Sequence, residues 1–365
     1  MARVPLNDLS RTDAATASNI VRAVADVIDR GAFLKNRYTA ELEQRLSNRL
    51  AGRPVLGVGN GTDALYLALR ATGVGVGRRV ANVANAGGYT TGATLRAGGS
   101  PVFVDVDPRT AQMSRAALAT VLEATPDVVA VVLTHLYGLV GDVQVIRSLC
   151  DERNVTLIED CAQSMGASVD GRSVGTFGDI ATLSFYPTKN LGAFGDAGAV
   201  VCATPDLHER VSVLAQYGWG QRYEVTVPGG INSRIDEIQA AVLLEAERLL
   251  DAQNERRRAI VSRYAAAVQG ERYLLAEQTE RYVGHLAVMV TEQRSEDAKR
   301  LDASGVGTGI HYPISDHRQP GWETAVPRAE LPNTDWLVDR ILTLPCFPAM
   351  SDDEVDQVAD ALASL

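Results

Sequence analysis

The chain has 365 residues, of which 46% are hydrophobic and 22% are charged, and its formal net charge is -10. These values are typical of a folded globular protein that is long enough for a large domain and a smaller companion. The acidic balance argues against a nucleic-acid-binding protein, because contacts to the phosphate backbone need a basic surface.

Residues 1–13 lack the apolar core of a signal peptide, and no apolar run approaches the ~18 residues of a membrane-spanning helix. We therefore expect a cytoplasmic protein with no membrane partner. The four cysteines form no C-x-x-C pair, and the five histidines form no H-E-x-x-H motif. Neither a disulfide framework nor a metal site is predicted.

Short apolar runs rich in β-branched residues alternate with helical patterns from residue 53 to residue 204. The expected strands lie within 53–60, 78–86, 100–107, 127–138, 154–163, 180–187 and 198–204. Their nearly continuous apolar character indicates strands that are buried on both faces. The alternation predicts an α/β domain with a largely parallel sheet.

The pattern changes after Asn232, where residues 234–268 read as a long helical stretch with apolar residues three and four apart. Sparser strand signals follow, and a last helix is expected to begin with a capping box made by Ser351 and Glu354. We therefore expect a large domain at 1–249 and a smaller domain at 250–365.

A possible phosphate site lies in "GNGTDAL", residues 59–65, which follows one expected strand and opens a helix. Backbone N–H groups and the helix dipole can hold a phosphate there. The segment also matches the relaxed dinucleotide fingerprint, but that site needs an acidic residue about 20 positions later. No acidic residue lies between Asp63 and Asp105. We predict a phosphate at Gly61 and Thr62 without a dinucleotide, and a simple helix N-cap is the alternative.

Two chemically active residues are expected at the carboxyl edge of the sheet. Asp160 ends one apolar strand, and Lys189 follows another in the sequence "FYPTKNLGAF". Burial in a crevice lowers the pKa of a lysine and frees its neutral amine to attack a carbonyl. A lysine, a buried acid and a phosphate site together suggest pyridoxal phosphate. In that arrangement Lys189 forms the Schiff base and Asp160 pairs with the ring nitrogen.

The motifs "GTDAL", "THLYG", "IEDCAQSMGA", "SFYPTKNLGAFGDAGAV" and "GIHYP" resemble those of the sugar aminotransferases of the DegT/DnrJ/EryC1/StrS family. The similarity runs from about Pro5 to Ala359. It implies a fold-type-I, pyridoxal-phosphate-dependent enzyme with a mostly parallel mixed sheet flanked by helices and a smaller α+β C-terminal domain. It also implies amino transfer from L-glutamate to a nucleotide-linked keto sugar, by a homodimer in which the partner chain completes each site.

The resemblance also assigns roles to individual residues. Lys189 is then the Schiff-base lysine, Asp160 the partner of the pyridine nitrogen and Gln163 a neighbour of the ring's 3-hydroxyl. The residues implied to hold the phosphate are Gly61, Thr62 and Ser184, together with Asn232 of the other subunit. The candidate substrate contacts are Tyr186, His311 and Tyr312.

One position departs from the family pattern. Family members often have an aromatic residue after Asn-Thr that stacks on the cofactor ring, whereas this chain has Gly87 there and Tyr89 two residues later. The spacing from Asn85 to Asp105 is unchanged, so no insertion explains the difference. We hypothesise that the glycine pair bends the loop and that Tyr89 takes over the stacking.

The segments "NAGGY" and "IHYPISDHRQPGW" resemble members that aminate C-3 of a dTDP-linked 3-keto-6-deoxyhexose in antibiotic deoxysugar pathways. Amination at C-4, or of a keto-inositol, remains an alternative because the motifs are nearly the same. A pyridoxal-phosphate-dependent sugar dehydratase would carry a histidine in place of Lys189. A non-catalytic nucleotide-sugar sensor would not need Lys189, Asp160 and Gln163 intact. These residues therefore favour a transaminase.

Overall fold

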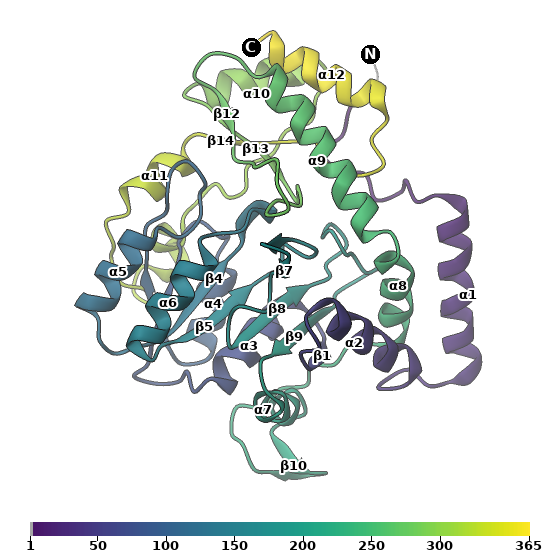
Figure 1. Cartoon of the computed structure of the whole chain (residues 1–365), viewed down its shortest axis with the longest axis vertical. Helices are drawn as coiled ribbons and strands as arrows, with labels where there is room; N and C mark the ends of the chain where they lie inside the picture. Colours follow the sequence, from purple (N-terminus) through teal and green to yellow (C-terminus); the bar gives the residue numbers. More distant parts are fainter. Residues whose placement is uncertain (1–2) are drawn as a thin grey trace.

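The computed structural model describes residues 3–365 (Figure 1). Its main sheet has seven strands in the order β1-β9-β8-β5-β4-β2-β3. The strands are β1 Val55–Val58, β2 Arg79–Asn82, β3 Ser100–Phe103, β4 Val128–Thr134, β5 Thr156–Asp160, β8 Ile180–Ser184 and β9 Gly198–Cys202. β9 runs antiparallel to both of its neighbours, and all other neighbouring strands are parallel. The predicted α/β fold with a mostly parallel mixed sheet is confirmed.

Strand register brings the predicted acid to the sheet edge. Thr134 of β4 pairs with Asp160 of β5, and Asp160 pairs with Thr182 of β8. Ser184 ends β8 two residues further on. Because these three strands are parallel, their carboxyl ends face the same crevice, as open α/β sheets require of a ligand site.

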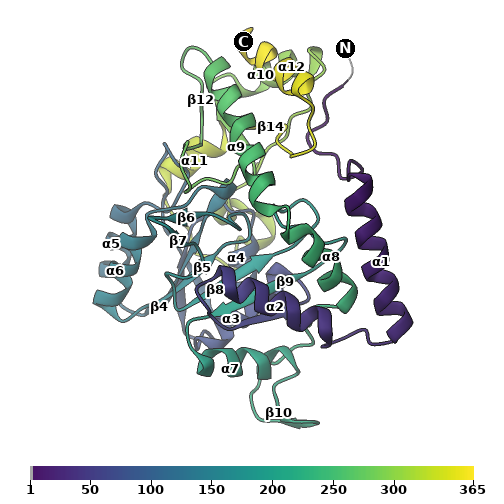
Figure 2. The ribbon, with the colours of Figure 1, turned by 45° about the vertical axis from the view of Figure 1, so that its right-hand side comes forward.

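Helices cover both faces of the sheet (Figures 1 and 2). They are α1 Ala14–Arg30, α2 Arg37–Arg49, α3 Gly61–Ala71, α4 Tyr89–Arg96, α5 Arg115–Ala124, α6 Val143–Arg153, α7 Pro205–Ala215 and α8 Glu237–Glu247. α3 is deeply placed, with every side chain from Ala64 to Leu69 buried. Because these consecutive side chains are enclosed by the core, α3 is held firmly where it opens beside the site.

The C-terminal part forms a second layer above the main sheet (Figure 1). It contains α9 Leu250–Ala267, α10 Arg294–Ala303, α12 Asp352–Ala363 and an antiparallel sheet of β12 Tyr273–Leu274, β13 Ala287–Val290 and β14 Ile341–Leu344. α12 begins with the predicted capping box of Ser351 and Glu354. Val4 is buried in this part and pairs with Val306, so the N-terminal segment is attached to it. The expected division near residue 250 remains a proposal.

One C-terminal segment returns to the large sheet. It carries the short helices η2 Asp316–Arg318 and η3 Pro320–Trp322 and leads to α11 Pro332–Val338. Val326 and Leu331 pack with Ala84 and Phe103, beside β2 and β3. Within residues 3–365, no helix is both long and apolar enough to cross a membrane.

Candidate active site

Lys189 lies in a tight turn directly after β8. Its backbone N–H donates to the carbonyl oxygen of Tyr186 at 2.8 Å. Burial lowers the pKa of Lys189 from 10.5 to about 8, although the negative charge of Asp160 opposes the shift. An appreciable fraction of the amine is therefore neutral near physiological pH, as a lysine that attacks a carbonyl requires.

Asp160 is a buried carboxylate at the end of β5. Burial raises its pKa above the ordinary value, while the N–H of Ala162, the charge of Lys189 and the hydroxyl of Thr134 act in the opposite direction. The N–H of Ala162 donates at 3.1 Å and the hydroxyl of Thr134 at 3.3 Å. These contacts fix the carboxylate beside Lys189, where it can pair with a cationic ring nitrogen.

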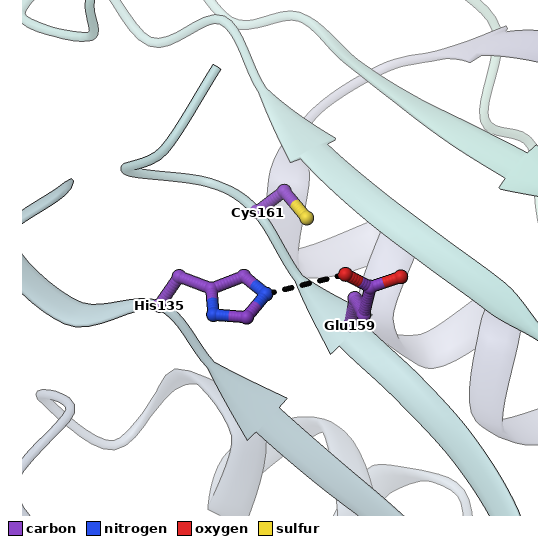
Figure 3. A group of neighbouring side chains, drawn as sticks. All are labelled: His135, Glu159 and Cys161. Atoms are coloured by element: carbon purple, nitrogen blue, oxygen red, sulfur yellow. Dashed lines mark hydrogen bonds and ion pairs between the residues drawn. The ribbon is translucent and has the colours of Figure 1, made fainter. Parts of the chain in front are cut away.

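A buried group of His135, Glu159 and Cys161 supports the same edge of the sheet (Figure 3). Glu159 and Cys161 flank Asp160 in the chain, and His135 directly follows β4. Three potential ligand atoms lie within 4.8 Å of one another. Glu159, however, already accepts hydrogen bonds from three backbone N–H groups at 2.6–2.9 Å and lies 3.3 Å from Nε2 of His135. Burial raises the pKa of the Cys161 thiol well above its ordinary value. We therefore interpret the group as a scaffold under the site rather than a metal centre.

The predicted phosphate site lies at the start of α3. Asn60 is the N-cap, and its side chain accepts from the N–H of Asp63 at 2.8 Å. A Cβ added to Gly61 would lie 2.7 Å from Cβ of Ser184 and 3.0 Å from its Oγ. The absence of a side chain at Gly61 thus lets Ser184 approach the helix start. Thr62 lies exposed in the first turn, so the structure brings these three predicted phosphate ligands together.

Gln163 connects the main sheet to the returning C-terminal segment. Its Oε1 accepts from the N–H of Tyr137 at 2.6 Å, and its Nε2 donates to the hydroxyl of Tyr312 at 3.3 Å. The ring of Tyr312 meets the ring of Tyr89 edge-on, with centroids 6.1 Å apart. His311 lies within 2.9 Å of Oγ1 of Thr343 through its Nδ1. The assigned roles of these residues remain predictions.

A cavity of about 510 Å³ opens beside Lys189. Its walls come from the N-terminal segment and α1, the lysine loop, α8, α9 and residues 347–349. Of the predicted site residues, Lys189 is the one that lines it, so this cavity lies on the side of the lysine loop and does not include Asp160 or the start of α3. Tyr186 is 53% exposed next to this loop, whereas Asn232 is an exposed residue on a different segment.

His285 is a neighbour of the lysine loop that the sequence did not reveal. It is buried, and its Nδ1 lies 3.0 Å from Oδ1 of Asn190, the residue after Lys189. Burial and the nearby charge of Lys189 lower its pKa well below 6.5, so the imidazole is neutral. The two partners are 95 residues apart, and no local spacing pattern connects them.

The residues present fit pyridoxal phosphate. Gly61 lets Ser184 approach a helix start whose backbone N–H groups can hold a phosphate, Asp160 is a buried acid for the ring nitrogen, and Lys189 is a desolvated amine for the aldehyde. Fold and site together define a pyridoxal-phosphate-dependent aminotransferase.

The particular family follows from comparison with known proteins. The DegT/DnrJ/EryC1/StrS aminotransferase family matches residues 15–363, and the chain belongs to this family. The dTDP-3-amino-3,4,6-trideoxy-alpha-D-glucose transaminase of Streptomyces venezuelae is 35% identical over 365 residues, covering 99% of this chain and 95% of the relative. The UDP-N-acetyl-3-dehydro-alpha-D-glucosamine 3-aminotransferase of Acidithiobacillus ferrooxidans is 34% identical over 361 residues, covering 98% and 97%.

A solved structure agrees with this assignment. The crystal structure of S. venezuelae DesV in complex with a ketimine intermediate has a TM-score of 0.94 and 34% identity to this chain. The match covers 100% of this chain and 98% of DesV. The predicted family, cofactor and reaction class are therefore confirmed.

Proposed function

We propose that the protein transfers an amino group from L-glutamate to C-3 of a nucleotide-linked 3-keto sugar, with dTDP-linked 3-keto-6-deoxyhexoses as the preferred class. The observation that carries the reaction is the desolvated amine of Lys189 beside the buried carboxylate of Asp160. Support for the substrate comes from the two relatives at 34–35% identity, whose names both specify a nitrogen at C-3 of a nucleotide-linked sugar.

Each site residue has a defined task in this reaction. When bound, pyridoxal phosphate supplies an electron sink that stabilises negative charge on the carbon next to the amine. Asp160 holds a proton on the ring nitrogen, and Gly61, Thr62 and Ser184 bind the phosphate. Nζ of Lys189 would take the α-proton of the donor and deliver it to the carbon on the other side of the amine nitrogen, the carbon that the cofactor's aldehyde provides. Since His285 is neutral, it adds no positive charge that would repel the ammonium form of Lys189.

The substrate proposal is tested by incubating the purified enzyme with glutamate and a panel of nucleotide-linked 3-keto and 4-keto sugars and keto-inositols. NMR of the product locates the new nitrogen. We expect amination at C-3. A nitrogen at C-4, an aminated inositol, or loss of a hydroxyl without amination would each contradict the proposal. Glutamine offered in place of glutamate tests the donor.

We also propose a homodimer with shared sites. The hairpin of β10 Trp219–Gln221 and β11 Glu224–Val225 projects from the main body (Figures 1 and 2). Its Tyr223 and Val225 are 72% and 61% exposed, so the hairpin offers apolar surface that a partner chain can cover. Asn232, shortly after the hairpin, is exposed as well. In the proposed dimer it reaches the partner's phosphate.

Mixed dimers test this arrangement. Lys189→Ala and Asn232→Ala are each expected to be impaired, because every site of either homodimer lacks one residue. If Asn232 acts in the partner's site, an equal mixture contains one intact site per heterodimer and recovers roughly a quarter of wild-type activity. If Asn232 acts in its own chain's site, the mixture regains no activity. Light scattering tests the dimer separately, and a monomer in solution would contradict it.

A further inference from the structure

The space above Gly87 is filled by a ring from a distant part of the chain. Gly87 has a φ of +76°, and a Cβ built on it would lie 2.9 Å from Cε1 and Cζ of Tyr312 and 3.0 Å from Cε2. Real Cβ atoms do not approach other atoms so closely. The ring of Tyr312 therefore occupies the place that a side chain at position 87 would take.

Three contacts hold this ring at the cofactor edge of the sheet. The hydroxyl of Tyr312 meets Nε2 of Gln163, three residues after Asp160. The buried Tyr137 donates its own hydroxyl to the carbonyl oxygen of His311 at 2.6 Å and so anchors the preceding residue. Tyr89 packs edge-on against the ring but keeps 49% of its own surface exposed. Of the two tyrosines, Tyr312 is the one whose side chain is hydrogen-bonded to Gln163, and Tyr89 lies on its outer, more exposed side.

A neighbouring aromatic residue provides an internal comparison. Trp322 lies over Gly88, where a Cβ would meet its Cη2 at 2.9 Å, and it also lies 3.7 Å from the corresponding position of Gly92 in α4. Trp322 belongs to the same returning segment as Tyr312, and it packs with Phe103 and Val326 beside the sheet. Trp322 therefore packs on Gly88 and Gly92 at the start of α4, whereas Tyr312 packs on Gly87.

We propose that Tyr312 supplies the aromatic ring that packs against the face of the pyridoxal phosphate ring, and that Tyr89 supports Tyr312 rather than stacking itself. The alternative is the hypothesis, made from the sequence, that Tyr89 stacks. Aromatic rings bind flat heteroaromatic groups through burial and favourable quadrupole geometry. Because this proposal concerns the cofactor alone, its failure would leave the proposed sugar substrate untouched.

The test is a titration of the cofactor-free protein with pyridoxal phosphate, followed by absorbance, protein fluorescence and the induced circular dichroism of the bound cofactor. Tyr312→Phe keeps the ring and should bind within about twofold of wild type, whereas Tyr312→Leu should bind about tenfold more weakly and alter the dichroism band. Tyr89→Leu should lose less than about threefold. Trp322→Leu is the matched control, with unchanged affinity expected.

The proposal is overturned if Tyr89→Leu weakens binding more than Tyr312→Leu, or if Tyr312→Leu binds as tightly as wild type. Should Tyr312→Leu fold poorly, Gly87→Ala provides a second measurement. Its methyl group is directed into the Tyr312 ring, and Gly88→Ala is the control for backbone strain, because Gly88 has a similar positive φ but its methyl group is directed into Trp322. Gly87→Ala should weaken cofactor binding clearly more than Gly88→Ala. Equal losses in the two variants contradict the proposal.

Discussion

The site has one wall made of strand ends and another made of a returning loop. Asp160 and Ser184 are fixed by strand pairing in β5 and β8, at the edge of a sheet that is buried on both faces. Tyr312 belongs to an irregular segment that is held by a few contacts, among them the hydrogen bond from Tyr137 to the carbonyl of His311. The comparison teaches that the two walls should respond differently to mutation. Loss of the Asp160 carboxylate in the strand wall should lower turnover, whereas changes in the loop wall should lower cofactor affinity and leave the turnover of the saturated enzyme nearly unchanged.

The largest effect is expected for Lys189→Ala. This change removes the group that moves the α-proton, so turnover should fall by at least about a thousandfold. The fold should remain intact, because removal of a desolvated ammonium offsets the loss of its attraction to Asp160. Single-turnover kinetics measures the first effect and thermal unfolding the second. If Lys189→Ala kept wild-type turnover, Lys189 would not be the group that moves the α-proton.

Asp160→Asn tests the chemistry of the strand wall with little change in shape. An ion pair near 4 Å is worth about 4 kcal/mol at an effective dielectric of 20, or about three pKa units for the ring nitrogen. Loss of that proton should lower turnover by roughly a hundredfold to a thousandfold. Thr134→Val, which removes only the 3.3 Å hydrogen bond to Asp160, is the matched control and should have a much smaller effect. Similar losses in both variants would contradict the proposed role of the charge.

The pH dependence of cofactor capture reports the desolvation of Lys189. Its pKa is lowered to about 8, and the neutral amine predominates above that value. Between pH 6 and pH 8 the rate at which the cofactor-free protein reacts with pyridoxal phosphate should rise about tenfold per pH unit and then level off. Stopped-flow absorbance measures the rate. A rise that continues to pH 10 would indicate an ordinary exposed lysine.

Gly61→Ala tests the contact between the strand wall and α3. The added methyl group would lie 2.7 Å from Cβ of Ser184, so the helix start and β8 must separate. We expect cofactor affinity to fall about tenfold, because the phosphate loses aligned N–H groups. Gly321→Ala is the control, since a Cβ there meets nothing within 4 Å. Unchanged affinity for Gly61→Ala would place the phosphate elsewhere.

The smallest effect is expected for Tyr137→Phe, which weakens the anchor of the loop wall. It removes the hydrogen bond to the carbonyl of His311, which is worth about 1 kcal/mol. Cofactor affinity should fall about threefold, with turnover of the saturated enzyme nearly unchanged. Titration and steady-state kinetics separate the two. A large fall in saturated turnover would show that the loop wall takes part in chemistry as well.

The sequence predicted most of the strand wall. Apolar runs located the strands, and because parallel strands end at one edge, Asp160 and Lys189 were expected to converge. The glycine pattern predicted the helix start at Gly61 for the same local reason, and a phosphate bound there stays a prediction. The hydrogen bonds did not follow from these patterns. Glu159 accepts from Phe177, and His285 contacts Asn190, and neither partner is close in the chain.

By itself, the sequence determined the fold class, the positions of Lys189 and Asp160 relative to their strands, and the start of α3. Each of these is set by residues close together in the chain. Only the tertiary structure decided what lies over Gly87. A missing side chain leaves space that any nearby ring can fill, and nearness depends on how the C-terminal segment packs against β2 and β3. The sequence directed attention to Tyr89, two residues away, whereas packing placed Tyr312 there. Contacts between segments far apart in the chain are fixed by the fold as a whole.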